Sequence, residues 1–289
     1  MKQFTRKDFL KTTALGLFSS AVFGNNAEQT TQRKQFQIGA CDWSIGNKSN
    51  LGSIEMARQI GLDGAQLSLG LKENNMHLRQ REVQKAYKTL AKIFNVGFTG
   101  LGIGELNQYP YKSDSQTDVW VGDSIDVAKA LDIPVILIAF FAKGDLKNDS
   151  KGTEAVIEKF KDVIPKAEKM GITLGIESWL SAEEHMYIID KVGSPNLKVY
   201  YDVANSEKMG YDIYEEILWL GKQNQICEFH FKENGALLGR GKVDFQKVKN
   251  CLDEINYQGA IQIEGAVPKG HLMLPSYIKN NAFVRDLLS

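Results

Sequence analysis

The stretch Val135-Ile136-Leu137-Ile138-Ala139-Phe140-Phe141 is apolar at every position. A strand with one face in water would alternate apolar and polar side chains, whereas a run without polar residues suits a strand that is buried on both faces. Such strands are typical of parallel sheets that are covered by helices. The stretch therefore predicts an α/β protein built on a parallel sheet.

Seven further runs of the chain are rich in apolar and β-branched residues, and amphipathic helical patterns separate them. We expect the eight strands at Phe36–Trp43, Gly64–Leu69, Gly97–Gly104, Ile133–Phe141, Ile172–Glu177, Leu197–Val203, Ile226–Phe231 and Ala260–Glu264. Eight strand–helix units in about 250 residues are typical of a (β/α)8 TIM barrel. A doubly wound sheet is the alternative, but it would carry a glycine-rich phosphate loop after its first strand, and Ala40-Cys41-Asp42-Trp43-Ser44 is not one. We therefore predict a single barrel domain over residues 36–289.

Signals for helix ends support this order of elements. Gly171 directly follows the helical pattern Glu154–Met170, where a glycine commonly ends a helix. Ser181 and Glu184 have the spacing of a capping box, which predicts the start of the next helix. A further helical pattern covers Asp212–Lys222.

The composition of the 289-residue chain is that of an ordinary globular protein, with 43% hydrophobic and 24% charged residues. The 35 basic and 35 acidic residues cancel, so the bulk charge gives no attraction to nucleic acid. Cys41, Cys227 and Cys251 are too few and too scattered for a disulfide scaffold or a paired-cysteine zinc site. We therefore expect an enzyme or a binding protein.

The first residues have the layout of a secretory signal peptide: a basic start, an apolar run over residues 14–23, and a stretch of small and polar residues that ends at Ala27. The segment Thr5–Lys11 also resembles a twin-arginine export signal in which Lys7 replaces the second arginine. We expect an export signal over residues 1–27, a linker over 28–35, and an exported, periplasmic protein with no membrane attachment after signal removal. An amphipathic N-terminal helix is the alternative.

Polar side chains interrupt the apolar strands in the second half of the chain, at or near the carboxyl end of each strand. They are Glu177, Asp202, His230 and Glu264, separated by 25, 28 and 34 residues. Each spacing matches one strand–helix unit, and barrel active sites lie at the carboxyl ends of the strands, so the four should lie side by side. A single carboxylate at a strand end usually caps a helix, but four such residues on consecutive strands indicate a shared site.

Three carboxylates cannot share a buried site without a cation to offset their repulsion. Three oxygen donors and one imidazole suit Mn²⁺, Mg²⁺, Co²⁺ or Fe²⁺ better than a structural zinc ion. We expect Mn²⁺, with Mg²⁺, Co²⁺, Fe²⁺ or Zn²⁺ as alternatives.

These residues resemble the metal-binding pattern of the xylose-isomerase-like TIM barrels, the sugar phosphate isomerase/epimerase family, which includes ketose 3-epimerases, hydroxypyruvate isomerase and inosose dehydratase. Three local motifs are similar to those of the family: Asp202-Val203-Ala204-Asn205 to D-x-x-N, His230-Phe231-Lys232-Glu233 to H-x-K-[DE], and Gly239-Arg240-Gly241-Lys242-Val243-Asp244-Phe245 to G-x-G-x-V-D-F. The resemblance covers residues 36–289. The chain departs from the well-studied epimerases of unphosphorylated ketoses at Asn205, where those enzymes have a histidine.

The resemblance implies a divalent-metal-dependent sugar isomerase or epimerase that transfers a proton next to the carbonyl of a ketose-type sugar through a metal-stabilised enediolate. Glu177 and Glu264 would be both metal ligands and the acid/base pair, while Asp202 and His230 would be ligands only. Lys232 would bind a substrate hydroxyl or phosphate. The remaining substrate-binding candidates are Asn205, Trp43 and Trp179, and the two aromatic rings, with Phe140, could pack against a sugar.

Three alternatives use the same barrel. A lyase or dehydratase acting on 3-keto-glycosides or related keto-sugars could use the same metal site, and export favours this class because phosphorylated sugars are scarce outside the cytoplasm. A sugar-binding protein could keep the metal for structure alone. An apurinic endonuclease would need several more histidines at strand ends than His77, His185, His230 and His271 supply. We therefore expect a small-molecule sugar as partner and no nucleic acid, and the sequence allows a homo-oligomer.

Overall fold

The structure is a computed structural model that describes residues 36–289. The expected export signal (1–27) and linker (28–35) lie outside the described residues. Within the described part of the chain, no helix is both long enough and apolar enough to cross a membrane.

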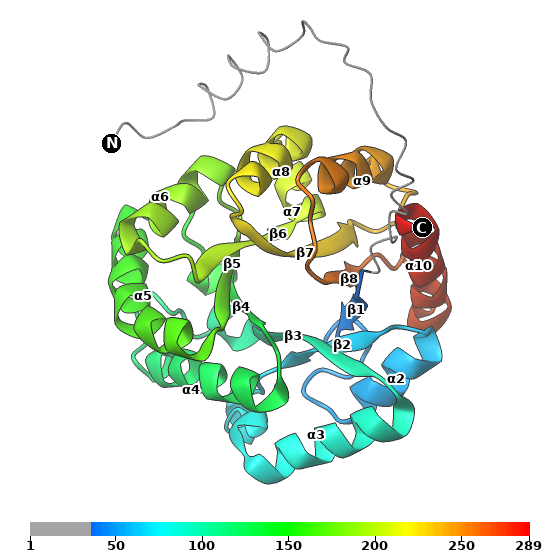
Figure 1. Ribbon diagram of the computed structural model, residues 1–289, viewed down its shortest axis with the longest axis horizontal. Coiled ribbons are helices and arrows are strands. Elements are labelled where there is room, and N and C mark those ends of the chain that lie inside the picture. The colour runs from blue at the N-terminus through cyan, green and yellow to red at the C-terminus, as the bar shows by residue number, and fades with distance from the viewer. Residues whose placement is uncertain (1–35) are drawn as a thin grey trace, which may run out of the picture. The chain divides into compact units, whose positions relative to one another are not determined.

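Eight parallel strands form a closed barrel in which each strand pairs with the next along the chain. The strands are β1 (Ile38–Cys41), β2 (Gly64–Ser68), β3 (Gly97–Ile103), β4 (Val135–Phe140), β5 (Thr173–Ser178), β6 (Leu197–Asp202), β7 (Ile226–Glu233) and β8 (Ile261–Gly265). The ring closes where β1 pairs with β8, with Ile38 opposite Ile261. Figure 1 shows the strands as an inner ring inside an outer ring of helices. The predicted (β/α)8 barrel is confirmed.

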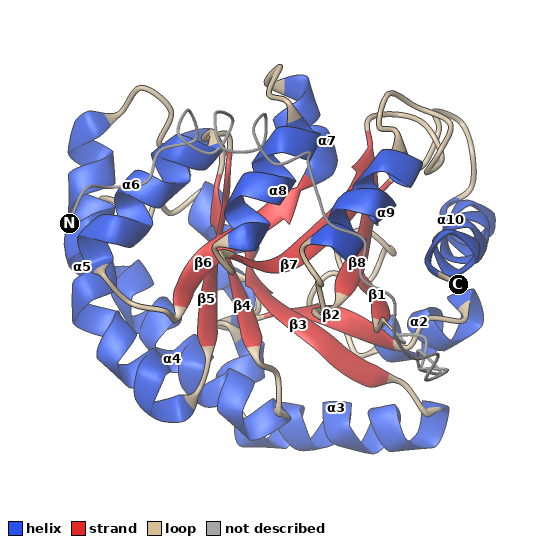
Figure 2. Cartoon of the chain, turned by 45° about the horizontal axis from the view of Figure 1, so that its top comes forward, coloured by secondary structure: helices blue, strands red, loops and turns tan. Residues whose placement is uncertain are grey.

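The helices cover the outside of the strands, and Figure 2 shows them as a blue layer around the red sheet. The α-helices are α2 (Gly52–Ile60), α3 (Arg81–Phe94), α4 (Gln116–Leu131), α5 (Ser150–Met170), α6 (Ala182–Val192), α7 (Val203–Lys208), α8 (Ile213–Lys222), α9 (Phe245–Glu254) and α10 (Met273–Leu288). Short 3₁₀ turns η1 (Lys72–Asn74), η2 (His77–Arg79), η3 (Gly104–Asn107) and η4 (Ala142–Gly144) lie in the loops.

Local sequence signals set the helix ends. Gly171 follows α5 in the left-handed region, with φ of 68°, and its N–H closes the last turn. Ser181 and Glu184 form the expected capping box at the start of α6. The helix expected from Glu154 begins four residues earlier, because the Asp149 side chain accepts a hydrogen bond from the Gly152 N–H and caps an additional turn.

Each strand differs from its expected range by no more than two residues at either end, so the strand ends carry the expected polar side chains. The strand interiors are apolar: Ile136, Ile138 and Phe140 of β4 are fully buried. The barrel thus brings the carboxyl ends of β5, β6, β7 and β8 together along one arc of its mouth.

Candidate metal centre and substrate pocket

Four side chains converge at the mouth of the barrel, one from each of the last four strands. Nδ1 of His230 lies 2.9 Å from Oε1 of Glu177, 3.8 Å from Oδ2 of Asp202 and 3.6 Å from Oε2 of Glu264. One ligand atom of each residue lies within 4.8 Å of the others, which is close enough to hold a metal ion. The register of the sheet produces this proximity, since Asp202 pairs directly with His230 across β6 and β7.

The local structure after β6 directs Asp202 into the cluster. Its Oδ1 accepts hydrogen bonds from the N–H groups of Ala204 and Asn205 and so caps α7. Its Oδ2 is buried and accepts no hydrogen bond from the described residues, although the Lys232 ammonium lies 3.3 Å away. A buried carboxylate oxygen without a hydrogen-bond donor is costly, and a cation between the four side chains would supply its partner.

Opposing charges perturb the ionisation of these groups. Burial raises the pKa of Asp202, although the charge of Lys232 acts to lower it. Burial acts to lower the pKa of His230, but Cys41, Glu177 and Glu264 around the ring raise it well above its usual value. Without a metal ion, a protonated His230 therefore offsets part of the negative charge of the carboxylates.

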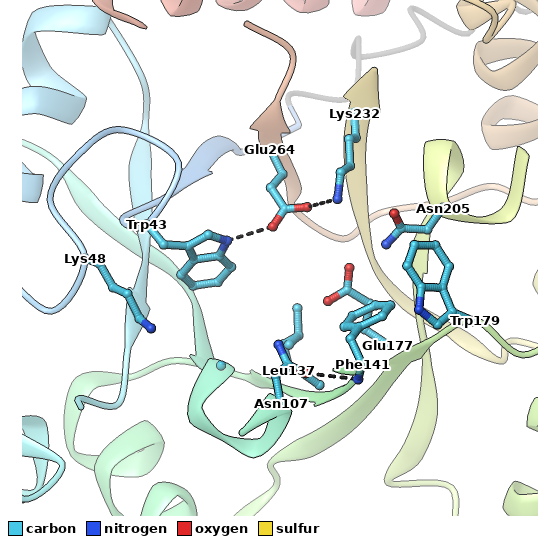
Figure 3. Close-up of a pocket in the computed structure, with 12 residues that line it drawn as sticks. Trp43, Lys48, Asn107, Leu137, Phe141, Glu177, Trp179, Asn205, Lys232 and Glu264 are labelled. Atoms are coloured by element: carbon cyan, nitrogen blue, oxygen red, sulfur yellow. Dashed lines mark hydrogen bonds and ion pairs between the residues drawn. The ribbon is translucent and has the colours of Figure 1, made fainter. Parts of the chain in front are cut away.

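The carboxylate of Glu264 is held by two donors. Trp43 Nε1 donates a 2.7 Å hydrogen bond to Oε1, and Lys232 Nζ donates a 2.7 Å hydrogen bond to Oε2 (Figure 3). Burial acts to raise the pKa of Glu264, but the charges of His230 and Lys232 and these two bonds lower it. Glu264 is therefore ionised at neutral pH.

A pocket of about 310 Å³ opens directly over the cluster. Glu177 and Glu264 line the pocket, and Figure 3 shows both carboxylates turned into its interior. Asp202 and His230 are 3% and 0% exposed and are not among the described residues that line it. Two of the four clustered side chains can therefore touch a bound molecule, and two lie beneath it.

The structure places the four predicted substrate-binding residues, Lys232, Asn205, Trp43 and Trp179, in the lining of this pocket. The expectation for Phe140 is wrong. Phe140 is fully buried against the rings of Tyr111 and Phe160 on the helix side of β4, and Phe141 lines the pocket instead. Strand alternation explains the reversal: Leu137 and Ala139 of β4 line the pocket, so Phe140 points to the helices and Phe141 points to the pocket side again.

Several residues near the site lie outside the set expected from the sequence. Lys48 and Asn107 line the pocket from the loop after β1 and from η3, and their ordinary loop composition gave no signal. Gln66 contacts His230 from inside the barrel, and its signal was a polar residue within the short β2 strand. Cys41 also faces His230, at 3.3 Å from Nε2, and is fully buried below the pocket.

The fold and this cluster define the class of the protein: a (β/α)8 barrel with a candidate metal centre at the carboxyl ends of its last four strands. The model of the family described as xylose isomerase-like TIM barrel matches residues 54–281. The chain belongs to that family.

Comparisons with individual proteins agree with this assignment. The chain is 24% identical over 135 residues to a D-psicose 3-epimerase of Enterocloster bolteae, covering 43% of this chain and 44% of that one. It is 22% identical over 177 residues to a 2-epi-5-epi-valiolone 7-phosphate 2-epimerase of an Actinoplanes species, covering 61% and 65%. The matches thus span less than two thirds of these curated relatives. The crystal structure of a D-allulose 3-epimerase from a Methylomonas species has the same fold, with a TM-score of 0.70 at 17% identity over 88% of this chain and 97% of that one.

Proposed function

We propose that this protein is a divalent-metal-dependent sugar isomerase or epimerase that moves a proton next to the carbonyl of a ketose-type sugar. One observation carries the proposal: Glu177 and Glu264 belong to the four-residue cluster and also line the pocket. Acid/base catalysis requires a group within hydrogen-bond reach of the substrate, and both carboxylates border the space that a substrate would occupy.

The donor set fits a divalent cation. Three carboxylates and one imidazole converge, and the buried Asp202 Oδ2 has no hydrogen-bond donor of its own among the described residues. Oxygen-rich sites with one imidazole suit Mn²⁺, which is the metal that we propose, and the ligands would be Glu177, Asp202, His230 and Glu264. When bound there, the cation would act as a Lewis acid that polarises the sugar carbonyl.

The side chains of the pocket account for the remaining steps. Glu177 and Glu264 lie on β5 and β8, so they would approach a bound sugar carbon from different sides, and one would remove a proton while the other returns one. Each positioned group of this kind contributes about 10²–10⁴-fold to the rate. Burial acts to lower the pKa of Lys232, but the charges of Asp202 and Glu264 raise it by more, so the side chain is positively charged. Its ammonium group lies beside Glu264, where it would also bind a substrate oxygen.

The walls of the pocket suit a sugar. Trp43, Phe141 and Trp179 present apolar rings, and Asn205 adds an amide. Pockets of this kind orient a ligand by a few polar groups within an apolar lining. The D-psicose and D-allulose 3-epimerases among the similar proteins are named for epimerisation of ketoses, which supports the same substrate class here.

Proton exchange in D₂O followed by NMR tests this function. The Mn²⁺-loaded protein would be incubated with free ketoses, phosphorylated ketoses and 3-keto-glycosides, and metal-stripped protein would be the control. An epimerase places deuterium at the reacting carbon of its product, and the metal-stripped protein does not. Elimination products without deuterium in the recovered substrate would identify a lyase instead, and a sugar that binds without any reaction would contradict enzymatic activity.

We also propose that residues 1–27 direct export to the periplasm, on the basis of their basic and apolar layout. Mass spectrometry of the protein recovered from its native host tests this, and a mature chain that still begins at Met1 would contradict it.

A further inference from the structure

The two ring nitrogens of His230 face different surroundings. Nδ1 faces the carboxylates of the cluster, and Nε2 lies 3.0 Å from Oε1 of Gln66. Gln66 lies on β2, three strands around the barrel from β7, which carries His230. The Gln66 side chain is 0% exposed. The contact therefore joins the candidate metal centre to the polar interior of the barrel.

A histidine that binds a metal through Nδ1 must present a lone pair there, so its proton has to be on Nε2. Metal-bound histidines almost always donate that second N–H to an acceptor, which fixes both the tautomer and the ring orientation. Gln66 Oε1 is an amide oxygen at hydrogen-bond distance from Nε2, whereas the nearby Cys41 sulfur is only a weak acceptor.

The orientation of the Gln66 amide follows from its neighbours. Cys41 Sγ donates to Gln66 Oε1 at 3.0 Å, and with a metal on Nδ1 the Nε2–H of His230 would be a second donor to the same oxygen. An amide rotated by 180° would place its NH₂ group against both donors. The contacts therefore favour the orientation in which the oxygen faces His230.

The barrel holds the Gln66 side chain in this place. Gly100 of β3 pairs with Gln66, and a Cβ at Gly100 would lie 3.1 Å from Gln66 Cγ. The absence of a side chain on β3 thus provides the space that Gln66 occupies beneath His230.

We propose that Gln66 is a positioning residue of the metal centre: its amide oxygen holds the Nε2–H tautomer of His230 and so presents the Nδ1 lone pair to the metal. The inference rests on the metal site of the proposed function. Without the amide oxygen, the proton can move to Nδ1 and form a hydrogen bond with Glu177, 2.9 Å away, in place of the metal bond.

Metal affinity tests this role independently of turnover. The Mn²⁺ dissociation constant would be measured by competition with a chelator for the wild type, Gln66→Leu, Gln66→Met and Gln66→Glu. Leu and Met keep the apolar bulk but remove the acceptor, and we expect each to weaken Mn²⁺ binding about 10–100-fold. Glu restores an acceptor and should bind Mn²⁺ much more tightly than either.

Gln262→Leu is the matched control. Gln262 is also a fully buried glutamine of the barrel interior, but its amide bonds to Thr99 and Glu228 and makes no hydrogen bond to His230. Its loss should lower the free energy of unfolding while leaving the Mn²⁺ dissociation constant within about threefold of wild type. Circular dichroism identifies the variants that fold. Two apolar replacements at position 66 are used so that the test still stands if one of the two variants does not fold.

Nitrogen-detected NMR of the histidine rings in the Zn²⁺-loaded protein gives the tautomer directly. We expect a protonated Nε2 on His230 in the wild type and a loss of that signature in the apolar variants. Wild-type Mn²⁺ affinity in a folded Gln66→Leu or Gln66→Met protein would overturn the role of Gln66 while leaving the metal site intact. A wild-type protein that binds no divalent metal would instead overturn the proposed metal site itself.

Discussion

The indole N–H of Trp43 donates a hydrogen bond of 2.7 Å to Glu264. Trp43 lies two residues after the end of β1 and Glu264 lies on β8, so the bond crosses the seam where the barrel closes. Gly102 of β3 makes room for the indole ring, because a Cβ there would lie 3.0 Å from it. A side chain from the first strand–loop unit thus fixes the orientation of a carboxylate from the last.

Trp43→Phe should weaken metal binding, because it keeps an aromatic wall but removes the donor to Glu264. Partners that orient a metal-binding side chain typically contribute about 10–100-fold to metal affinity, so we expect the Mn²⁺ dissociation constant to rise about tenfold or more. Isothermal titration calorimetry measures it. Trp179→Phe is the control, because Trp179 lines the same pocket without a hydrogen bond to the cluster, and equal effects of the two substitutions would contradict the role of the indole N–H.

Glu177→Gln and Glu264→Gln should each reduce turnover about 10²–10⁴-fold on a verified substrate, because a neutral amide cannot accept a proton at neutral pH. Both variants keep an oxygen toward the metal and should still bind it, more weakly than wild type. Steady-state kinetics and solvent deuterium exchange would be measured side by side. A variant that exchanges the substrate hydrogen without completing epimerisation would identify the carboxylate that acts first, and wild-type turnover in both variants would refute the two-glutamate mechanism.

His185 should make the protein less stable as the pH falls from about 6.5 to about 4. Burial lowers its pKa from 6.5 to about 4, and the neutral ring contacts Ser178 Oγ and the Ser181 carbonyl oxygen. The unfolded chain takes up the proton first in this window, so the free energy of unfolding falls by up to about 3 kcal/mol. Urea unfolding at a series of pH values should show a shallower decline in His185→Gln than in the wild type. The same substitution at His271, which is exposed, is the matched control.

Gly39→Ala should destabilise the barrel by about 1–3 kcal/mol, because overpacking of a filled interior forces side chains from their preferred positions. A Cβ at Gly39 would lie 2.2 Å from both Gln262 Oε1 and Thr99 Oγ1. The Thr99 hydroxyl donates a hydrogen bond to that Gln262 oxygen. Gly122→Ala in α4 is the opposite case, since a Cβ there meets no atom within 4 Å, and it should stabilise the helix by roughly 0.5–1 kcal/mol. Urea denaturation of the two variants should give shifts of opposite sign.

The barrel could be predicted from the sequence because its evidence is periodic. Uninterrupted apolar runs such as Val135–Phe140 indicate buried parallel strands, and their number and spacing match one fold. The same logic placed Glu177, Asp202, His230 and Glu264 together, because strand ends of a parallel barrel share one rim. Both predictions depend on spacing along the chain, which a single sequence displays.

The remaining features depend on side-chain orientation and on contacts between neighbouring strands, which spacing does not reveal. The choice between Phe140 and Phe141 depended on which face of β4 points into the barrel, and an uninterrupted apolar run does not show that. Nothing in the spacing of Gly100 and Gly102 indicated their role, which is to leave room for Gln66 and Trp43. These contacts join side chains of different strand–loop units, and one sequence carries no direct signal for them.

The closure of the ring has a consequence for synthesis on the ribosome. Trp43 and Glu264 are 221 residues apart. At about 5–20 residues per second, Glu264 is added roughly 10–45 s after Trp43. Throughout that interval β1 lacks the partner that it finds in β8, and its unpaired edge can pair with another chain. The nascent chain, rather than the finished barrel, is therefore the form in which this protein is most open to aggregation, and chaperone binding during translation would protect it most before β8 emerges.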